Sequence, residues 1–232
     1  EELREQVPLM KEVLAAMGVP ILTMAGYEAD DILGTIAKRC QAEGEEVSVV
    51  SGDRDLLQLS DTHIKIRIPK TSRGTTEIHD YYPEDVKREY QVTPTEFVDV
   101  KALMGDTSDN IPGVPSIGEK TATNLIVAYG SIENAYAHRD EVKPPRAKKA
   151  LEEHYDLAVM SKELAEICIT CPIPFEYEEA KIENLYTPEA YQYMKRLEFK
   201  SILARFDVQD MGGNSVEEHF WSVEDLSGAE QI

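Results

Sequence analysis

The stretch Val47-Ser-Val-Val-Ser-Gly-Asp-Arg-Asp-Leu-Leu-Gln-Leu59 joins an apolar run to an acidic turn and a second apolar run. Residues 47–51 predict a short buried strand, since valine dominates a run bounded by glycine and aspartate. Asp53 and Asp55 follow that strand. Their spacing of two points both side chains the same way at its carboxyl end, where open α/β sheets place their sites. An exposed acidic turn is the alternative, but the leucines that follow disfavour it because they continue at once into a buried helix.

Strands and helices alternate around this stretch, which predicts an α/β fold with a parallel sheet flanked by helices. We expect a helix over residues 1–17, a strand over 19–24 and a second helix over 28–43. Residues 63–68 alternate polar and apolar, and residues 75–79 follow a glycine turn. We expect these two segments to pair as a hairpin that closes one edge of the sheet.

From residue 83 the pattern becomes helical, which predicts a helical subdomain after the sheet. The expected helices cover residues 83–90, 94–104, 118–129, 131–137 and 145–167, followed by a strand at 175–177 and a helix at 188–206. Beyond residue 207 the composition turns to glycine and acid, which favours a linker. We therefore divide the chain into an α/β part at residues 1–82, a helical part with closing helices at 83–206, and an acidic linker toward a further domain at 207–232.

We interpret His154 and the three cysteines as structural residues rather than as members of a catalytic or metal site. In the helix expected at 145–167, three- and four-residue steps join Ala150, His154, Leu157, Met160, Leu164 and Ile167, so we interpret His154 as a packing residue. The three cysteines, Cys40, Cys168 and Cys171, lack the second pair or the histidines of a zinc site, and we interpret them as reduced thiols. A redox pair at Cys168 and Cys171 is disfavoured because the segment resembles a strand rather than the start of a helix.

The 232 residues are 42% hydrophobic and 29% charged, and their formal net charge is −20. Such a charge argues against a nucleic-acid partner, because phosphates attract lysine and arginine. Much of the acid, however, lies in three clusters or near the chain ends, and bound divalent ions would cancel part of it. No apolar run reaches the roughly 18 residues of a membrane span and no leader pattern begins the chain, so we expect no membrane segment and a cytoplasmic location.

Glu28, Asp30 and Asp31 form a second acidic cluster. Glu28 and Asp31 are three residues apart on a predicted helix, so both project on nearly one face, with Asp30 at its flank. The alternative is that acids favour the first turn of a helix because of its dipole. Carboxylates gathered this densely repel one another unless cations lie among them, and Mg²⁺ or Mn²⁺ fits such a site.

The third cluster, Asp106 and Asp109, ends a predicted helix, although aspartate also favours turns without any metal. It leads into Ile111-Pro-Gly-Val-Pro-Ser-Ile-Gly-Glu-Lys-Thr121, a glycine hairpin that aims backbone N–H groups and a helix N-terminus outward, as anion sites do. Such a hairpin binds backbone phosphate without distinguishing bases. The contacts that we expect come from Gly113, Ser116, Gly118, Lys120 and Thr121.

Two enzyme classes are disfavoured by these patterns. The hairpin nearly spells a nucleotide-binding P-loop, but Glu119 separates Gly118 from Lys120 and the preceding segment is helical, which argues against an ATPase. The histidines lie in no motif with a nucleophile, which argues against a Ser/His/Asp hydrolase.

Three motifs in chain order now carry a resemblance. Tyr27-Glu-Ala-Asp-Asp31, Ser51-Gly-Asp-Arg-Asp-Leu-Leu-Gln-Leu59 and Leu103-Met-Gly-Asp-Thr-Ser-Asp-Asn-Ile-Pro-Gly-Val114, followed by Ile117-Gly-Glu-Lys-Thr-Ala122, resemble the 5′-nuclease domains of bacterial DNA polymerases I. The resemblance runs from Glu1 to about Phe206. It implies a PIN-like α/β fold with a helix-hairpin-helix subdomain and two-metal cleavage of DNA near 5′ ends and flaps.

The resemblance also implies roles for the acidic residues and the hairpin. The catalytic metals would be held by Glu28, Asp30, Asp31, Asp53 and Asp55, of which Asp31, Asp53 and Asp55 are the catalytic residues, and Asp106 and Asp109 would complete the outer part of the cluster. The two metals, about 4 Å apart, would activate a water and stabilise the leaving oxygen. The hairpin would hold duplex phosphate, with K⁺ bound by its carbonyl oxygens. The implied assembly is a monomer covalently linked to polymerase domains.

This sequence departs from the family pattern in two ways. The family begins with two aspartate-bearing strands and a basic helical arch that threads the 5′ end, and this chain contains none of them, so we expect it to cleave flaps very poorly. Ser116 stands where these hairpins usually have glycine, and serine would be strained there if the position needs a positive φ.

Two rival functions remain open. A non-catalytic DNA-binding module could retain the hairpin, although the intact acidic clusters count against it. A free-standing flap nuclease or a PIN-type ribonuclease is the other rival, and the acidic tail with Gly212 and Gly213 favours a longer multidomain parent instead.

Overall fold

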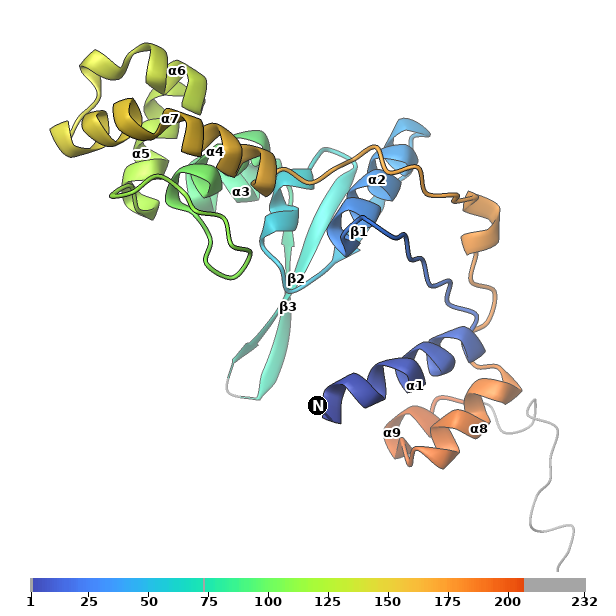
Figure 1. The fold of residues 1–232 in the computed structure, drawn as a ribbon. Helices are drawn as coiled ribbons and strands as arrows, with labels where there is room; N and C mark the ends of the chain where they lie inside the picture. The colour runs from blue at the N-terminus through green and yellow to red at the C-terminus, as the bar shows by residue number, and fades with distance from the viewer. Residues whose placement is uncertain (1, 73, 207–232) are drawn as a thin grey trace, which may run out of the picture. The chain divides into compact units, whose positions relative to one another are not determined.

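The computed structural model describes residues 2–72 and 74–206, so the linker predicted at 207–232 lies outside the described residues (Figure 1). The described chain forms two compact units. One comprises residues 23–173, and the other combines residues 2–22 with residues 174–206. The candidate site lies entirely within the first unit.

The sheet of residues 23–173 has three strands in the order β1-β2-β3, with β1 at Val47–Val50, β2 at Ile64–Ser72 and β3 at Thr75–Tyr81. β1 pairs with β2 in parallel and β2 with β3 in antiparallel register, which confirms the predicted hairpin and makes the sheet mixed. Ile64, Ile66 and Ile68 occupy alternate positions of β2, so their side chains share one face of the sheet, and all three are buried.

The strand predicted at residues 19–24 is wrong, because these residues form no strand in the structure. Their apolar composition fits a strand, but a strand also needs a neighbour for its backbone hydrogen bonds, and none of the described strands pairs with this segment. Ile21 and Leu22 are 39% and 36% exposed in consequence.

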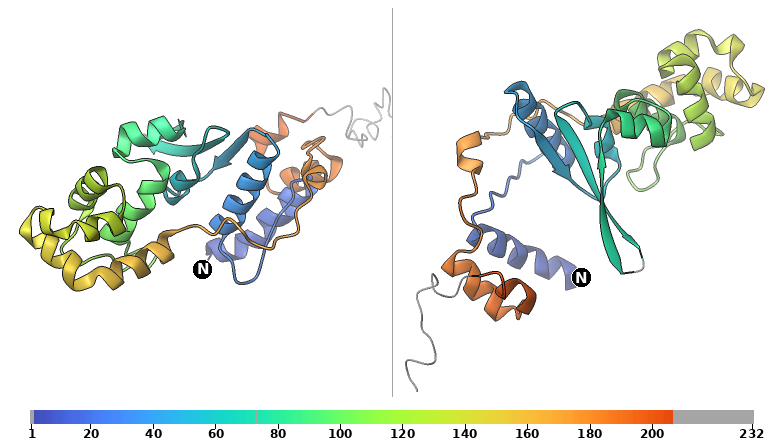
Figure 2. Two further views of the ribbon diagram at one scale, coloured as in Figure 1. Left: turned by 90° about the horizontal axis from the view of Figure 1, so that it is seen from above. Right: turned by 180° about the vertical axis from the view of Figure 1, so that it is seen from behind.

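Helices pack at both sides of this sheet. Figures 1 and 2 show α2, at Ala29–Ala42, beside β1, and a group of helices on the other side. The group contains α3 at Pro83–Tyr90, α4 at Pro94–Met104, α5 at Glu119–Tyr129, α6 at Ile132–Ala137, the 3₁₀ turn η2 at Arg139–Glu141 and α7 at Pro145–Ala165. Leu103, Ile126, Ile132 and Leu151 are fully buried in one apolar core among them. This confirms the predicted combination of an α/β sheet with a helical part.

The packing stripe predicted along the last of these helices is only partly correct. Met160 and Leu164 are 43% and 57% exposed, while Ala158 and Ser161 are buried instead. The cause is a kink at His154, whose φ of −132° is not helical and which shifts the buried face between the two halves of α7.

The segment that contains Cys168 and Cys171 is irregular, so the strand predicted there is wrong. Arg39 of α2 donates to the carbonyl oxygens of Cys171 and Ile173 at 3.0 and 2.9 Å, which satisfies carbonyls that a strand would have paired. All three cysteines are free thiols, as predicted.

In the second unit, α1 at Glu2–Ala16 packs on α8 at Pro188–Arg196 and α9 at Lys200–Leu203 through a small core of Val13, Ala16, Ala190, Met194 and Phe206. The strand predicted at 175–177 is wrong, because a 3₁₀ turn, η3, begins there at Tyr177–Ala180. The helix predicted at 188–206 is interrupted where Glu198 adopts a φ of +58°. Within the described ranges, no helix has the length and apolarity to cross a bilayer.

Candidate active site

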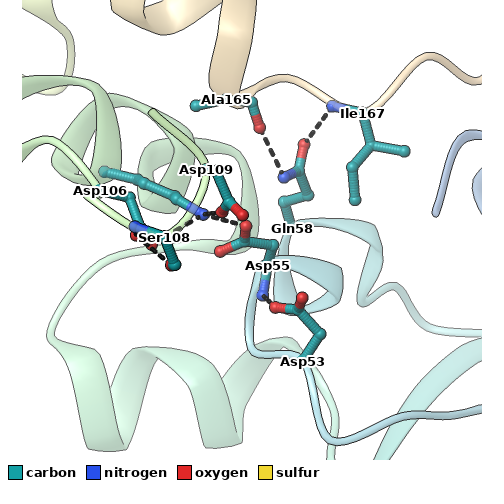
Figure 3. A network of polar contacts seen from close by, with 9 residues as sticks. Asp53, Asp55, Gln58, Asp106, Ser108, Asp109, Ala165 and Ile167 are labelled. Carbon is teal, nitrogen blue, oxygen red and sulfur yellow. Dashed lines mark hydrogen bonds and ion pairs between the residues drawn. The ribbon is translucent and has the colours of Figure 1, made fainter. Parts of the chain in front are cut away.

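The N-terminus of α2, the turn after β1 and the loop after α4 meet around one cavity of about 600 Å³. Its lining includes all of the carboxylates singled out from the sequence except Asp106: Glu28, Asp30, Asp31, Asp53, Asp55 and Asp109. Residues up to 140 positions apart in the sequence, from Glu28 to Cys168, are thus brought together. Figure 3 shows Asp55 with Asp106 and Asp109, the former from η1 at Asp55–Leu59 and the latter two from the loop after α4.

Backbone N–H groups fix the orientation of Asp31. Its Oδ2 accepts from the Glu28 N–H at 3.1 Å, as an acid in the first turn of a helix does, and its Oδ1 accepts from the Cys168 N–H at 2.8 Å. A carboxylate has about four lone-pair positions, so these two bonds leave acceptor capacity toward the cavity.

The turn after β1 is held in the same way. The Asp53 N–H donates to Ser51 Oγ at 3.0 Å, and the Asp55 N–H donates to Asp53 Oδ1 at 2.9 Å. Leu56 and Leu57, both fully buried, anchor η1 in the sheet core. The predicted buried helix is therefore confirmed as a 3₁₀ turn that fixes the two aspartates.

The electrostatics show that the first two clusters act on each other. Burial raises the pKa of Asp30, and the negative charges of Asp53 and Asp55 raise it further. Burial also raises the pKa of Asp55, against the opposing effect of a hydrogen bond from Lys101. Uncompensated negative charge is therefore concentrated around Asp30.

Lys101 is the main residue that the sequence analysis missed. Its side chain is 4% exposed, and its Nζ donates to Asp55, to Asp109 at 2.9 Å and lies 3.3 Å from Asp106. Burial opposes its charge, but the hydrogen bonds to Asp55 and Asp109 outweigh burial and raise its pKa above the ordinary value. The available signal was a single lysine inside the apolar run from Phe97 to Met104.

The loop after α4 is a closed turn. Asp106 and Ile111 exchange backbone hydrogen bonds of 2.9 and 2.8 Å. Hydrogen bonds from the hydroxyl and the N–H of Ser108 lower the pKa of Asp106 to about 2. Gly113 is required at its exit, because a Cβ there would lie 2.5 Å from the backbone nitrogen of Gly105.

Gln58 joins η1 to the end of α7 and the residues after it, and it was also missed by the sequence analysis. Its Nε2 donates to the Ala165 carbonyl at 3.0 Å, and its Oε1 accepts from the Ile167 N–H at 2.9 Å, as Figure 3 shows. This side chain thereby ties η1 to the segment that presents Cys168 to Asp31.

The donor set fits a hard divalent cation in its chemistry, since carboxylate oxygens are the ligands that Mg²⁺ and Mn²⁺ prefer, and neighbouring carboxylates help to raise the pKa of Asp30 and of Asp55. The cage is not preassembled. Among the described residues, no three His, Cys, Asp or Glu side chains are placed to hold one ion together. Water-mediated ligation or a small rearrangement of the turns is therefore needed.

Some polar groups of the hairpin are already hydrogen-bonded within the protein, and others are not. The Gly113 N–H donates to the buried Ser161 Oγ at 3.1 Å, so this residue builds the turn. Ser116 has a φ of +74°, so the position does need a positive φ, and its Oγ accepts from Arg146 at 3.1 Å. Arg146 is a third residue that the sequence analysis missed.

The first turn of α5 faces outward. The Thr121 N–H already donates to the Gly118 carbonyl at 2.9 Å. The N–H groups of Gly118, Glu119 and Lys120 have no acceptor among the described residues, as expected at the start of a helix. These donors and the exposed side chain of Lys120 have the chemistry that an anion requires at a helix start.

Two family models match the chain. Residues 1–91 match the 5′-3′ exonuclease, N-terminal resolvase-like domain, and residues 92–187 match the 5′-3′ exonuclease, C-terminal SAM fold. Together they account for most of the chain.

Individual relatives and solved structures are also similar to this chain. DNA polymerase I of Bacillus caldotenax is 44% identical over 206 residues, which are 89% of this chain and 23% of that protein. The T5 D15 protein crystallised with metal ions has a TM-score of 0.53 at 26% identity, covering 64% of this chain and 53% of its own. The T5 flap endonuclease in a complex with DNA and metal ions has a TM-score of 0.53 at 22% identity, covering 79% and 60%, which shows the shared fold. The chain spans about a quarter of the length of the DNA polymerases it matches.

Proposed function

The chain belongs to the 5′-3′ exonuclease family, and from this premise we propose that it is the metal-dependent 5′-3′ exonuclease and flap endonuclease part of a bacterial DNA polymerase I, acting in replication and repair. The observation that carries the proposal is the cavity that carboxylates of all three acidic clusters line together. A fold that needed these acids only for stability would pair them, whereas Asp30 is surrounded by further carboxylates.

Each part of the cavity has a task in this proposal. Asp31, Asp53 and Asp55 are the catalytic ligands, Glu28 and Asp30 complete their shell, and Asp106 and Asp109 form the outer part of the cluster with Lys101. Mg²⁺ or Mn²⁺ held there would supply an activated water and stabilise the leaving oxygen. The protein itself positions the carboxylates, through the backbone bonds to Asp31 and Asp53 and through the Gln58 clamp.

The hairpin is the proposed duplex contact. Gly118, Lys120 and Thr121 begin α5, Ser116 places Arg146 beside it, and Gly113 supplies the turn. Backbone donors and lysine contact phosphate in any sequence, so the binding is expected to be independent of sequence. The same proposal includes K⁺ bound by the hairpin carbonyls, a monomeric state and a cytoplasmic location. It also includes linked polymerase domains and the division of the chain after residues 82 and 206.

Metal binding and DNA binding are tested separately. Millimolar Mn²⁺ should raise the melting temperature, and the rise should shrink in Asp53→Asn, because the ion binds only the folded arrangement of carboxylates. In an anisotropy titration, Lys120→Glu should weaken the binding of several unrelated duplexes alike, while the charge-matched control Lys11→Glu on α1 should not. No metal-dependent shift in either protein would remove the metal site, and unchanged binding by Lys120→Glu would place the DNA elsewhere.

Activity is tested on a 5′-flap substrate with Mg²⁺. The comparison is between this chain and a longer version that carries the two aspartate-bearing strands and the basic arch of the family pattern. Since the geometry of attack depends on every ligand, a small misplacement costs on the order of 100-fold in rate. We expect the extended version to cleave and Asp53→Asn to abolish that cleavage. Cleavage that survives Asp53→Asn would refute the assignment.

A further inference from the structure

A second cavity, of about 310 Å³, shares Asp55 with the acidic one. We call it the aromatic cavity, and its walls include Arg54, Tyr90, Gln91, Phe97, Lys101 and Thr123. Asp55 lines both cavities, so a strand whose phosphate reaches the carboxylates brings its neighbouring nucleotide to the mouth of the aromatic cavity.

The inner wall of the aromatic cavity is apolar. Tyr90 and Phe97 pack edge to face with ring centroids 5.1 Å apart, and the buried Val92 and Val100 lie beside them. Such a surface offers a π-system against which a flat ring can stack.

The rim carries hydrogen-bonding groups that the described part of the protein leaves unused. The guanidinium of Arg54 and the side-chain amide of Gln91 make no hydrogen bond or ion pair with any described residue. Gln91 ends α3 with a φ of +67°, a conformation that a residue other than glycine seldom adopts, and this holds its side chain at the rim. The Thr123 hydroxyl already donates to the Glu119 carbonyl at 2.9 Å, so what it leaves unused is the acceptor capacity of its oxygen.

The aromatic cavity also continues toward the hairpin. A shallower hollow is lined by Gln91, Glu119, Lys120, Thr123 and Asn124, and it shares Gln91, Glu119 and Thr123 with the aromatic cavity. A path therefore runs from Lys120, which we assign to phosphate, through Gln91 and Thr123 to Asp55.

The charges decide which part of a nucleotide enters. Four carboxylates line the aromatic cavity, Asp55, Glu89, Asp106 and Glu119, against two cations, Arg54 and Lys101, and Lys101 is already engaged by aspartates. This surplus of acid repels a phosphate, whereas an uncharged base is accepted by an apolar wall with a few polar groups at its rim.

We propose that the aromatic cavity binds one unpaired nucleobase of the DNA strand, next to the phosphate that lies at the carboxylates. The proposal rests on the proposed function and adds a base-binding subsite to it. Tyr90 and Phe97 stack the base, Gln91 and Thr123 bond its edge, and Arg54 contacts the backbone outside.

The experiment compares intact strands with strands that lack a single base. A set of duplexes with a single-stranded 5′ arm is prepared, each carrying one abasic nucleotide at a different arm position, so that the phosphate charge is constant throughout. Binding is measured by anisotropy with Ca²⁺ present to neutralise the carboxylates. Wild type should bind about tenfold more weakly when one particular position is abasic, in line with the loss of one stacked base.

Two variants link that position to the aromatic cavity. Thr123→Tyr fills the cavity and should remove the preference for the base, and Gln91→Ala, at an exposed residue that cannot disturb the core, should reduce it. Ala128→Tyr, on the exposed side of the same helix, is the matched control and should behave as wild type. Equal affinity for intact and abasic strands at every position, or an undiminished preference in both variants, would overturn the subsite. Failure of wild type to bind the fully intact duplex would overturn the proposed function itself.

Discussion

Asp99 and Lys101 lie two residues apart on α4, and both are buried, but they belong to opposite kinds of charge cluster. Asp99 accepts from Lys162 at 2.8 Å and from the Ile132 N–H at 3.1 Å, and Lys162 also pairs with Glu133 at 2.9 Å. Each carboxylate of that cluster, which joins α4, α6 and α7, is paired with Lys162, and the excess is a single negative charge. We call it the balanced cluster.

Around Lys101, by contrast, three aspartates share one ammonium group, and Asp30 and Asp53 lie beyond them without a cation. We call this the acidic cluster. Folding alone gives no reason to gather such an excess, because each further carboxylate costs Coulomb energy. The difference between the two clusters distinguishes charge that serves the fold from charge that serves a ligand. Removing a residue from each should therefore give opposite responses to metal.

The largest effect is expected in the balanced cluster. Lys162→Met leaves the buried Asp99 without its cation, and we expect the free energy of unfolding to fall by about 3 kcal/mol. Since no metal replaces Lys162, Mn²⁺ should not restore the loss. Urea unfolding followed by circular dichroism measures both quantities. Lys149→Met is the control, because its ion pair with Glu153 is exposed and worth at most about 0.5 kcal/mol. An equal loss in the two variants would contradict the role of Asp99.

The acidic cluster should behave differently. Lys101→Met removes the one cation that pairs with Asp55, Asp106 and Asp109 among the described residues. Without metal we expect a loss of about 2 kcal/mol, less than at Lys162 because the side chains of Asp106 and Asp109 are 26% and 50% exposed. Mn²⁺ should then recover most of it, because a divalent ion supplies the missing charge. The same urea experiment with and without Mn²⁺ is the measurement. A loss that metal leaves unchanged would mean that the acidic cluster is structural, like the balanced one.

The pH dependence sharpens the contrast without changing Lys101. Burial and the neighbouring carboxylates Asp53 and Asp55 raise the pKa of Asp30 above its ordinary value of 3.8. At a pH just above 3.8, the folded protein therefore binds more protons than the unfolded chain. Stability must then fall as the pH rises through the window between the two values. Asp30→Asn should remove this fall in urea melts without metal, and Mn²⁺ should reduce it in wild type. A stability that rises through this window in wild type and not in the variant would reverse the sign and refute the argument.

The sequence predicted the aspartates of the acidic cluster better than the residues that hold them in place. Asp53 and Asp55 could be placed because a strand of period two and a leucine pair fix their direction, and the glycine hairpin defines Gly113 and Ser116 locally. Lys101 and Gln58 could not be assigned, because the bonds from Lys101 to Asp55 and from Gln58 to Ala165 span 46 and 107 residues and depend on how α4 and α7 pack. The prediction of a strand at residues 19–24 was wrong for the same reason, since a strand forms only where a neighbouring strand accepts its backbone hydrogen bonds. Local chemistry was predictable, and long-range pairing was not.

The smallest effect concerns the hairpin, which belongs to neither cluster. Ser116 has a φ of +74°, a conformation that glycine adopts without a Cβ clash. Ser116→Gly should therefore raise the free energy of unfolding by about 0.5–1 kcal/mol, with the same value with and without Mn²⁺. Ser116→Ala is the control, because it loses the hydroxyl that accepts from Arg146 but keeps the Cβ, and it should bring no gain. If alanine stabilised the protein as much as glycine, the cause would be the hydroxyl and not the backbone. If the gain from glycine depended on Mn²⁺, the hairpin would be coupled to the acidic cluster, and the two regions could no longer be treated as independent.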